Sequence, residues 1–163
     1  ILYMSTVPSS FHQWVVGRLL ELVGLRTEER KEMYPCIGPV GLVLSDRDVV
    51  QPDFLLVRQN RASIFREGRI FGPPDLIVEV LSPSNPEQDT VVKREAYARA
   101  GVPEYWMVRP ATRDAILCWQ PDVDLGDYAQ VRPVLANTTL ISPTLDVQLE
   151  IAQLFAGVPD TTL

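Results

Sequence analysis

With 163 residues and an ordinary apolar content, the chain is long enough for one domain with a buried core, and no apolar run approaches the roughly 20 residues that span a bilayer. The formal net charge of −6 argues against a generally basic nucleic-acid-binding protein. The two cysteines, Cys36 and Cys118, are too few and too far apart for a disulfide framework or a zinc site, so we expect a cytoplasmic protein without membrane association.

The first half of the chain is expected to hold one helix and two strands. Apolar residues recur at helical spacing after Ser9 and Ser10, either of which can cap the helix, and Gly24 can end it. Two apolar runs flank the polar segment 45–48, a pattern that predicts a hairpin. The expected elements are a helix over 10–23, a charged loop over 26–34, and strands over 40–44 and 49–57.

The second half is expected to begin with a basic loop over 58–73, because this segment contains four arginines and one acidic residue, Glu67. Further on we expect a strand over 75–81, a helix from 85–90 to Gly101, a strand over 104–108, and short strands near 114–119, 127–134 and 146–150. This order predicts a single domain over 1–163 of the α/β (α+β) class, in which helices flank a mixed central sheet and a small β-rich extension follows.

Glu79 is the first candidate for chemistry. It is the one carboxylate in the aliphatic strand 76–81, which is typical of a central strand covered on both faces. An ionised carboxylate in such a layer costs several kcal/mol unless a metal ion, a cation or a proton compensates it. An ion pair with Lys93 or with an arginine remains the simpler alternative.

Asp53 repeats this pattern on the preceding strand. It follows Pro52, which cannot donate to a sheet ladder and therefore marks an edge or a bulge that re-aims the next side chain. Two neighbouring apolar strands that each carry one inward acid suit a hard divalent cation. A bulge acid satisfied by backbone N–H groups is the alternative.

Lys93 is one of only two lysines, against thirteen arginines. It lies one turn before Tyr97 on the same side of the predicted second helix, which directly follows the Glu79 strand. From there an ammonium can reach back over the strand end, where it could orient a water or stabilise negative charge. Alternatively, Lys93 is a solvated helix residue.

At this point the chain resembles the Uma2 family of restriction-endonuclease-like bacterial proteins, which is assigned to the PD-(D/E)XK nuclease superfamily. The residues that carry the resemblance are Gln51-Pro52-Asp53, the run from Pro74 through Glu79 to Ser84, Asp89, Lys93, Tyr97, and Gly101 through Trp106. The resemblance covers roughly residues 5–155. It implies an αβββαβ restriction-endonuclease-like core, a divalent metal, and hydrolysis of phosphodiester bonds.

Carried over residue by residue, Asp53 matches the first acid of the family and Glu79 the second. The superfamily's usual lysine position is here Leu81, so Lys93 on the helix takes its place. The helix and acidic strand with which family members usually begin are reduced to residues 1–4. Glu21, an acid on the first helix, has no settled role.

Several further residues receive secondary roles. Asp75 and Tyr97 are possible accessory groups, although Asp75 fits a capping acid slightly better and Tyr97 fits packing equally well. Asp89 is expected to cap its helix. The single histidine, His12, is more typical of a satisfied or exposed residue than of a ligand. The arginines expected to contact nucleic acid are Arg58, Arg61, Arg66 and Arg69.

The leading hypothesis is an endonuclease that uses Mg²⁺ or Mn²⁺. Asp53 and Glu79 would hold the metal, and Lys93 would assist the attacking water. The expected substrate is nucleic acid, most simply DNA, and a homodimer would suit cleavage of both strands. The alternative is a catalytically silent nuclease-fold module that binds DNA or protein. Glycoside hydrolysis by the two acids ranks far below, because no aromatic platform for a sugar is evident.

Overall fold

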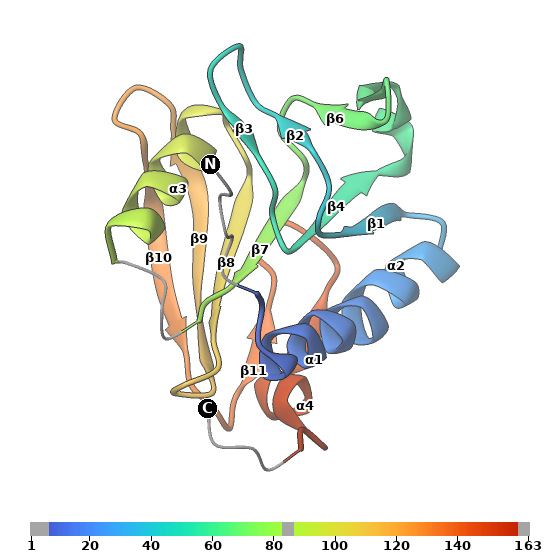
Figure 1. Ribbon diagram of the computed structural model, residues 1–163, viewed down its shortest axis with the longest axis vertical. Coiled ribbons are helices and arrows are strands. Elements are labelled where there is room, and N and C mark those ends of the chain that lie inside the picture. Colours follow the sequence, from blue (N-terminus) through green and yellow to red (C-terminus); the bar gives the residue numbers. More distant parts are fainter. Residues whose placement is uncertain (1–6, 83–86, 160–163) are drawn as a thin grey trace.

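The computed structural model describes residues 7–82 and 87–159, with side chains at 87–89 excepted. Its centre is a mixed six-stranded sheet in the order β1-β4-β7-β8-β9-β10 (Figure 1). Neighbouring strands are antiparallel except for the parallel pair of β7 and β8. The strands are β1 (Met33–Ile37), β4 (Phe54–Arg58), β7 (Leu76–Val80), β8 (Glu104–Arg109), β9 (Asp114–Asp122) and β10 (Asp127–Val134).

Each face of the central sheet is covered by its own apolar layer. On one face lie α1 (Ser10–Leu19) and α4 (Ile151–Phe155), and on the other lie α3 (Glu87–Arg99) and a smaller sheet. Every residue of β7 is buried. Val78 points into the α1 layer and Ile77 into the α3 layer, as the period of two requires. The predicted mixed sheet with flanking helices is therefore confirmed.

The first helix continues past Gly24, where the sequence predicts its end. A π-helical turn, η1 (Leu20–Gly24), leads directly into α2 (Leu25–Glu29), and β1 begins at Met33, so the loop predicted over 26–34 is wrong for most of its length. A Cβ on Gly24 would lie 3.0 Å from the Cβ of Pro35 and 3.3 Å from the ring of Phe54. Gly24 therefore permits close packing of the helix on the sheet and is not a helix end.

The smaller sheet has the order β3-β2-β6-β5. Its strands are β2 (Leu42–Val43), β3 (Val49–Val50), β5 (Phe65–Arg66) and β6 (Arg69–Phe71). The pairing of β2 with β3 confirms the hairpin, but the single strand predicted over 49–57 is split at 51–53 between the two sheets. The break falls at Pro52, which lacks the N–H that a continuous ladder needs.

The basic segment 58–73 is more ordered than the predicted loop. It forms a 3-10 turn, η2 (Gln59–Ile64), and then the β5–β6 hairpin. Phe65 pairs with Ile70, and Ile70 is buried in the α3 layer. These apolar residues fold the segment onto the sheet, whereas charge alone predicted an open loop.

The chain ends in a two-stranded sheet and a short helix. β11 (Thr139–Ile141) pairs with β12 (Gln148–Glu150), and α4 follows directly. The strands predicted near 114–119, 127–134 and 146–150 are confirmed, whereas β11 and α4 were not predicted. The expected helix start at 85–86 and the N-terminal element expected at 1–4 lie outside the described residues. Within the described ranges, no helix is both long enough and apolar enough to cross a bilayer.

Candidate active site

The register of the central sheet brings Asp53 and Glu79 together. Phe54 of β4 pairs with Val78 of β7 in an antiparallel ladder, so the next position places Asp53 opposite Glu79. The N–H of Val80 donates to Oδ2 of Asp53 over 2.8 Å. The two predicted acids therefore lie side by side on the α3 face, at the carboxyl end of β7.

A close backbone approach fixes the bend that precedes β4. The N–H of Gly38 donates to the carbonyl oxygen of Asp53 over 2.8 Å. A Cβ at Gly38 would lie only 2.6 Å from the carbonyl oxygen of Pro52. Because that neighbour is backbone, any larger residue at position 38 must displace the bend that carries Asp53.

Helix α3 supplies two contacts to Glu79. The hydroxyl of Tyr97 donates to Oε1 of Glu79 over 2.6 Å, and Nζ of Lys93 lies 3.5 Å from the same oxygen. The two α3 residues are one turn apart on the same side of the helix, as their spacing predicted. Leu81, the strand position at which the resemblance implied a lysine, packs against the apolar layer.

The electrostatics of the pair differ between its members. The pKa of Glu79 is raised to about 7, mainly by burial. The charge of Asp53 raises this pKa as well, whereas the charge of Lys93 and the hydrogen bond from Tyr97 act to lower it. Burial also raises the pKa of Asp53, but hydrogen bonds with His12 and with the N–H of Val80 bring it below its usual value. Near neutral pH, Asp53 is therefore ionised while Glu79 is partly protonated.

His12 is the residue that the sequence did not assign to this group. Its Nε2 lies 3.1 Å from Oδ2 of Asp53, and its side chain is 13% exposed. The hydrogen bond to Asp53 raises the pKa of His12 above its usual value although burial lowers it, and the charges of Asp53 and Glu79 raise it further. A lone histidine in the first turn of a capped helix was the available signal, and it did not indicate a partner.

Comparison with known proteins identifies the family. The family described as "Uma2: Putative restriction endonuclease" matches residues 1–153. The chain belongs to the Uma2 family. No curated protein matches it.

A solved structure gives an independent check on the Uma2 fold. It is described as a "putative nuclease belonging to DUF820" from Anabaena variabilis, and it shares 15% sequence identity with this chain. The similarity covers 91% of this chain and 82% of the other, with a TM-score of 0.74. At this identity the likeness shows the fold, and it confirms the predicted nuclease-like architecture.

Asp75, a possible accessory acid of the Uma2 site, is engaged elsewhere. It precedes β7, at the end opposite Glu79, and its Oδ2 accepts from the backbone N–H of Arg58 over 2.8 Å and from Arg61 over 3.0 Å. Arg61 also donates to the carbonyl of Pro73 over 2.7 Å. Nε of Arg58 lies 3.4 Å from Oδ1 of Asp75 as well. Asp75 therefore has a structural role and engages the side chains of two of the four arginines expected to contact nucleic acid.

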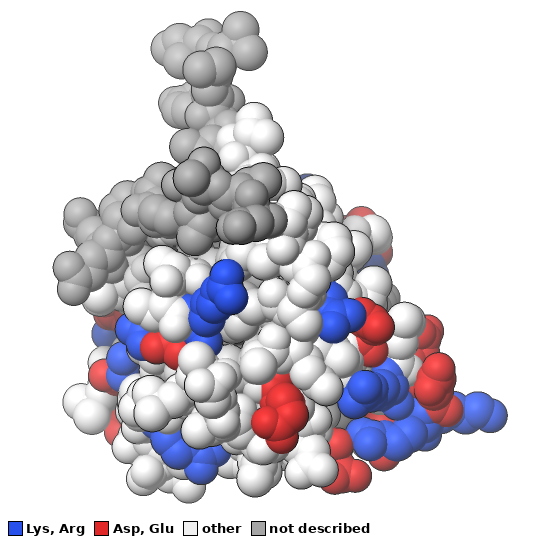
Figure 2. Space-filling view, turned by 90° about the horizontal axis from the view of Figure 1, so that it is seen from below, with Lys and Arg blue, Asp and Glu red and all other residues white. Residues whose placement is uncertain are grey.

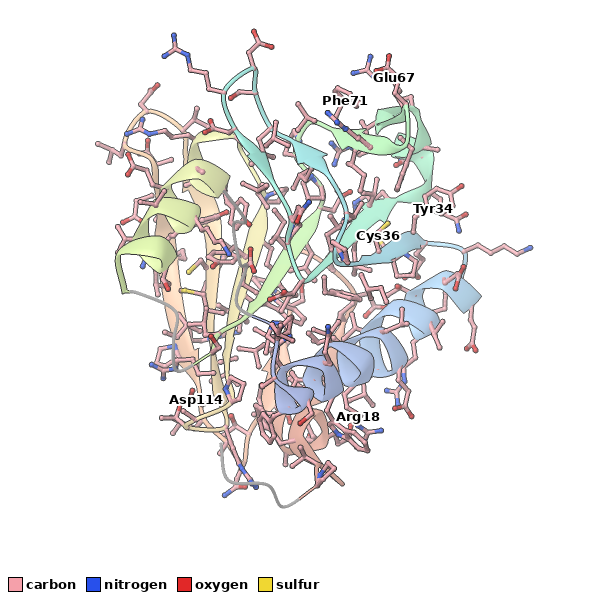
Figure 3. The ribbon with its side chains drawn as sticks, viewed as in Figure 1. Arg18, Tyr34, Cys36, Glu67, Phe71 and Asp114 are labelled. Carbon is pink, nitrogen blue, oxygen red and sulfur yellow. The ribbon has the colours of Figure 1, made fainter. Side chains whose placement is uncertain are left out.

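The other two of those arginines lie on the β5–β6 hairpin and are exposed. The guanidinium of Arg66 lies 4.6 Å from the ring centre of Phe71. Figure 3 shows that the hairpin region marked by Phe71 and Glu67 lies far from Arg18 of α1. On the lower face of the molecule, in contrast, acidic and basic residues are interspersed over the described surface (Figure 2). Arg66 and Arg69 are therefore the better candidates for phosphate contacts.

Two further residues of the Uma2 chain lie outside the acidic pair. Glu21 is exposed and forms an ion pair with Arg18, so the acid of the first helix faces solvent. Asp89 lies within the first turn of α3, which begins at Glu87, and is not its N-cap. Asp89 follows the first residue of the helix by two positions, so the prediction that it caps the helix is wrong.

The donor set limits which metal the site suits. Within residues 7–82 and 87–159, no cluster of three or more histidine, cysteine, aspartate or glutamate side chains has a metal-binding arrangement. A closed zinc site needs four such ligands, whereas Mg²⁺ commonly takes one or two carboxylates together with waters and substrate phosphates. The two carboxylates of Asp53 and Glu79 are thus too few for a closed zinc site and equal in number to those that Mg²⁺ commonly takes.

Proposed function

We propose that this Uma2 protein is a Mg²⁺- or Mn²⁺-dependent endonuclease that hydrolyses phosphodiester bonds of nucleic acid, most simply DNA. One observation carries the proposal: two acids from neighbouring strands meet at one sheet end, and Nζ of Lys93 lies 3.5 Å from Glu79. The family description of a restriction endonuclease supports the same reaction class.

Each residue of the group has a distinct task. Asp53 and Glu79 would hold the cation, which when bound supplies Lewis acidity and lowers the pKa of a water. The ammonium of Lys93 is a compact point charge that can orient a water or stabilise charge on the phosphate oxygens. The hydroxyl of Tyr97 fixes the orientation of Glu79 through its 2.6 Å hydrogen bond.

Substrate binding is assigned to the small sheet. Arg66 and Arg69 are exposed on β5 and β6, and these strands cover the same face of the central sheet that carries Glu79. Arginines so placed can contact the phosphates of a strand that crosses the site. We further propose a homodimer, which would bring two sites to the two strands of a duplex, and a cytoplasmic location, which free Cys36 and Cys118 suit.

A second candidate function is a catalytically silent module that binds DNA or protein. It is favoured by the limited ligand set, since the described residues offer only two close carboxylates, and by the pKa of about 7 at Glu79. A partly protonated acid competes with a cation at neutral pH.

A cleavage assay distinguishes the two functions. Plasmid DNA, linear duplex DNA and single-stranded RNA are incubated with Mg²⁺, Mn²⁺ or EDTA, using the parent protein and Glu79→Ala. The proposal expects metal-dependent cleavage that Glu79→Ala abolishes and that Lys93→Ala slows by about two to three orders of magnitude, the usual effect of one lost electrostatic contact.

Two further variants test whether the reaction needs an ammonium group and from which position it can be supplied. Lys93→Arg should restore little activity, because a planar guanidinium does not replace a point charge. Leu81→Lys combined with Lys93→Ala should recover part of it. Nucleic-acid binding without cleavage on all three substrates would favour the silent module, and full activity in Lys93→Ala would remove the lysine from the mechanism.

A further inference from the structure

The first turn of α1 lies directly beside the acidic pair. Oγ of Ser9 accepts from the backbone N–H of His12 over 3.1 Å, so a capped helix start holds His12 in place. From there Nε2 of His12 reaches to 3.1 Å from Oδ2 of Asp53. The charges acting on the imidazole are those of Asp53, Glu79 and Lys93, which are the same three groups assigned to the reaction.

The contact defines which oxygen of Asp53 is held. An ionised carboxylate only accepts hydrogen bonds, so the hydrogen in this contact resides on Nε2 of His12. The same Oδ2 accepts from the N–H of Val80 over 2.8 Å. Two donors on one oxygen fix the rotation of the Asp53 carboxylate, which also shares a side-chain hydrogen bond with Glu79.

The second nitrogen of the ring supports a functional reason for this placement. Within the described residues, Nδ1 of His12 is buried and has no hydrogen-bond partner. Most buried polar groups are paired, and an exception calls for an explanation. A buried histidine with a purely structural role is expected to have hydrogen-bond partners at both ring nitrogens. Among the described residues, the side-chain contact of this ring is with Asp53, through Nε2.

We propose that His12 is a positioning residue of the metal site, whose Nε2–H holds Oδ2 of Asp53 and so fixes the orientation of the carboxylate that would hold the divalent cation. This role rests on the proposed function. Partners that orient metal-binding carboxylates typically change metal affinity by about 10–100-fold when they are lost. His12 therefore acts on the cation through Asp53.

Side-chain geometry supplies a matched pair of variants. The amide nitrogen of glutamine lies as many bonds from the backbone as Nε2 of histidine, whereas that of asparagine corresponds to Nδ1. His12→Gln should therefore keep the donor to Asp53, and His12→Asn should lose it while remaining polar. His12→Ala removes the group altogether.

The experiment measures Mn²⁺ affinity by isothermal titration calorimetry, with no nucleic acid present, for the parent, the three His12 variants and Glu79→Ala. His12→Ala and His12→Asn are expected to bind Mn²⁺ about 10–100-fold more weakly than the parent, and His12→Gln within a few-fold of it. Thermal unfolding in EDTA confirms that each variant is folded. If His12→Ala does not fold, the comparison of glutamine with asparagine decides the question.

The outcomes separate this inference from the proposed function. A parent that binds Mn²⁺ in a Glu79-dependent manner, with unchanged affinity in His12→Asn and His12→Ala, would overturn the role of His12 alone. Affinity as weak in His12→Gln as in His12→Asn would likewise show that the Nε2 donor is not what matters. A parent that binds no Mn²⁺ would overturn both the metal site and the role assigned to His12.

Discussion

Replacing Glu79 by glutamine tests the electrostatics of the site through stability alone. Glu79 is 3% exposed, and burial is the main reason that its pKa lies at about 7, above its usual 4.5. The folded protein thus binds this proton more strongly than the unfolded chain. The resulting stabilisation is fully present below pH 4.5 and is lost as the pH rises through about 7.

The magnitude follows from that interval. Between pH 5 and pH 8 the parent should lose about 2–3 kcal/mol of stability that Glu79→Gln does not lose, because the amide does not titrate. For a domain of this size that corresponds to roughly 5–10 °C in Tm. Oε1 of glutamine can still accept from Tyr97, so the hydrogen bond seen in the parent is preserved.

The assay is thermal unfolding in EDTA at several pH values between 5 and 8. The pKa of His12 is also raised, mainly by the hydrogen bond to Asp53, which contributes a loss of stability in the same direction; this loss is smaller in the variant, which lacks the charge of Glu79. The difference between parent and variant therefore reports the titration of Glu79 together with the effect of its charge on His12. An identical pH dependence of Tm in the two proteins would refute the assignment of a raised pKa to Glu79.

Three further predictions concern other side chains. Tyr97→Phe should lower stability by about 1–3 kcal/mol, because it leaves Oε1 of Glu79 without its buried donor, and denaturant unfolding measures this. Charge reversal of Arg66 and Arg69 together should reduce the slope of log K against log salt by up to about 2 in DNA-binding titrations; an unchanged slope excludes them from the interface. Tyr105→Phe should change stability by less than about 0.5 kcal/mol, since this buried hydroxyl has no partner among the described residues, and a larger loss would reveal one.

The acidic pair could be predicted because its signals are local. A strand of aliphatic residues with one carboxylate must be covered on both faces, and the period of two decides which face the carboxylate shares. The same period places Asp53 on the face of Leu55, in the α3 layer. Only the register was needed to bring Asp53 and Glu79 opposite each other, and the sheet supplies it.

The contacts of Asp75 and His12 could not be predicted because they depend on tertiary packing. Arg58 and Arg61 looked like a basic loop, but a sequence shows the charge of an arginine and not its partner. Asp75, distant in sequence, binds both arginines in the structure. His12 reaches Asp53 only because a continuous helix carries the first turn of α1 to the sheet end.

In the proposed function, a metal ion and a proton would compete for the same carboxylate, that of Glu79. Asp53 is ionised at neutral pH because His12 and the N–H of Val80 stabilise its charge, whereas burial keeps Glu79 partly protonated at a pKa of about 7. A divalent cation that binds both acids must displace that proton, so its apparent affinity rises with pH until Glu79 is fully ionised. The ammonium of Lys93, 3.5 Å from Glu79, favours the ionised form and so makes the proton easier to lose. In the proposed function Lys93 would thus contribute to metal binding as well as to the reaction, and activity tests are most informative above pH 7, where both acids are ionised.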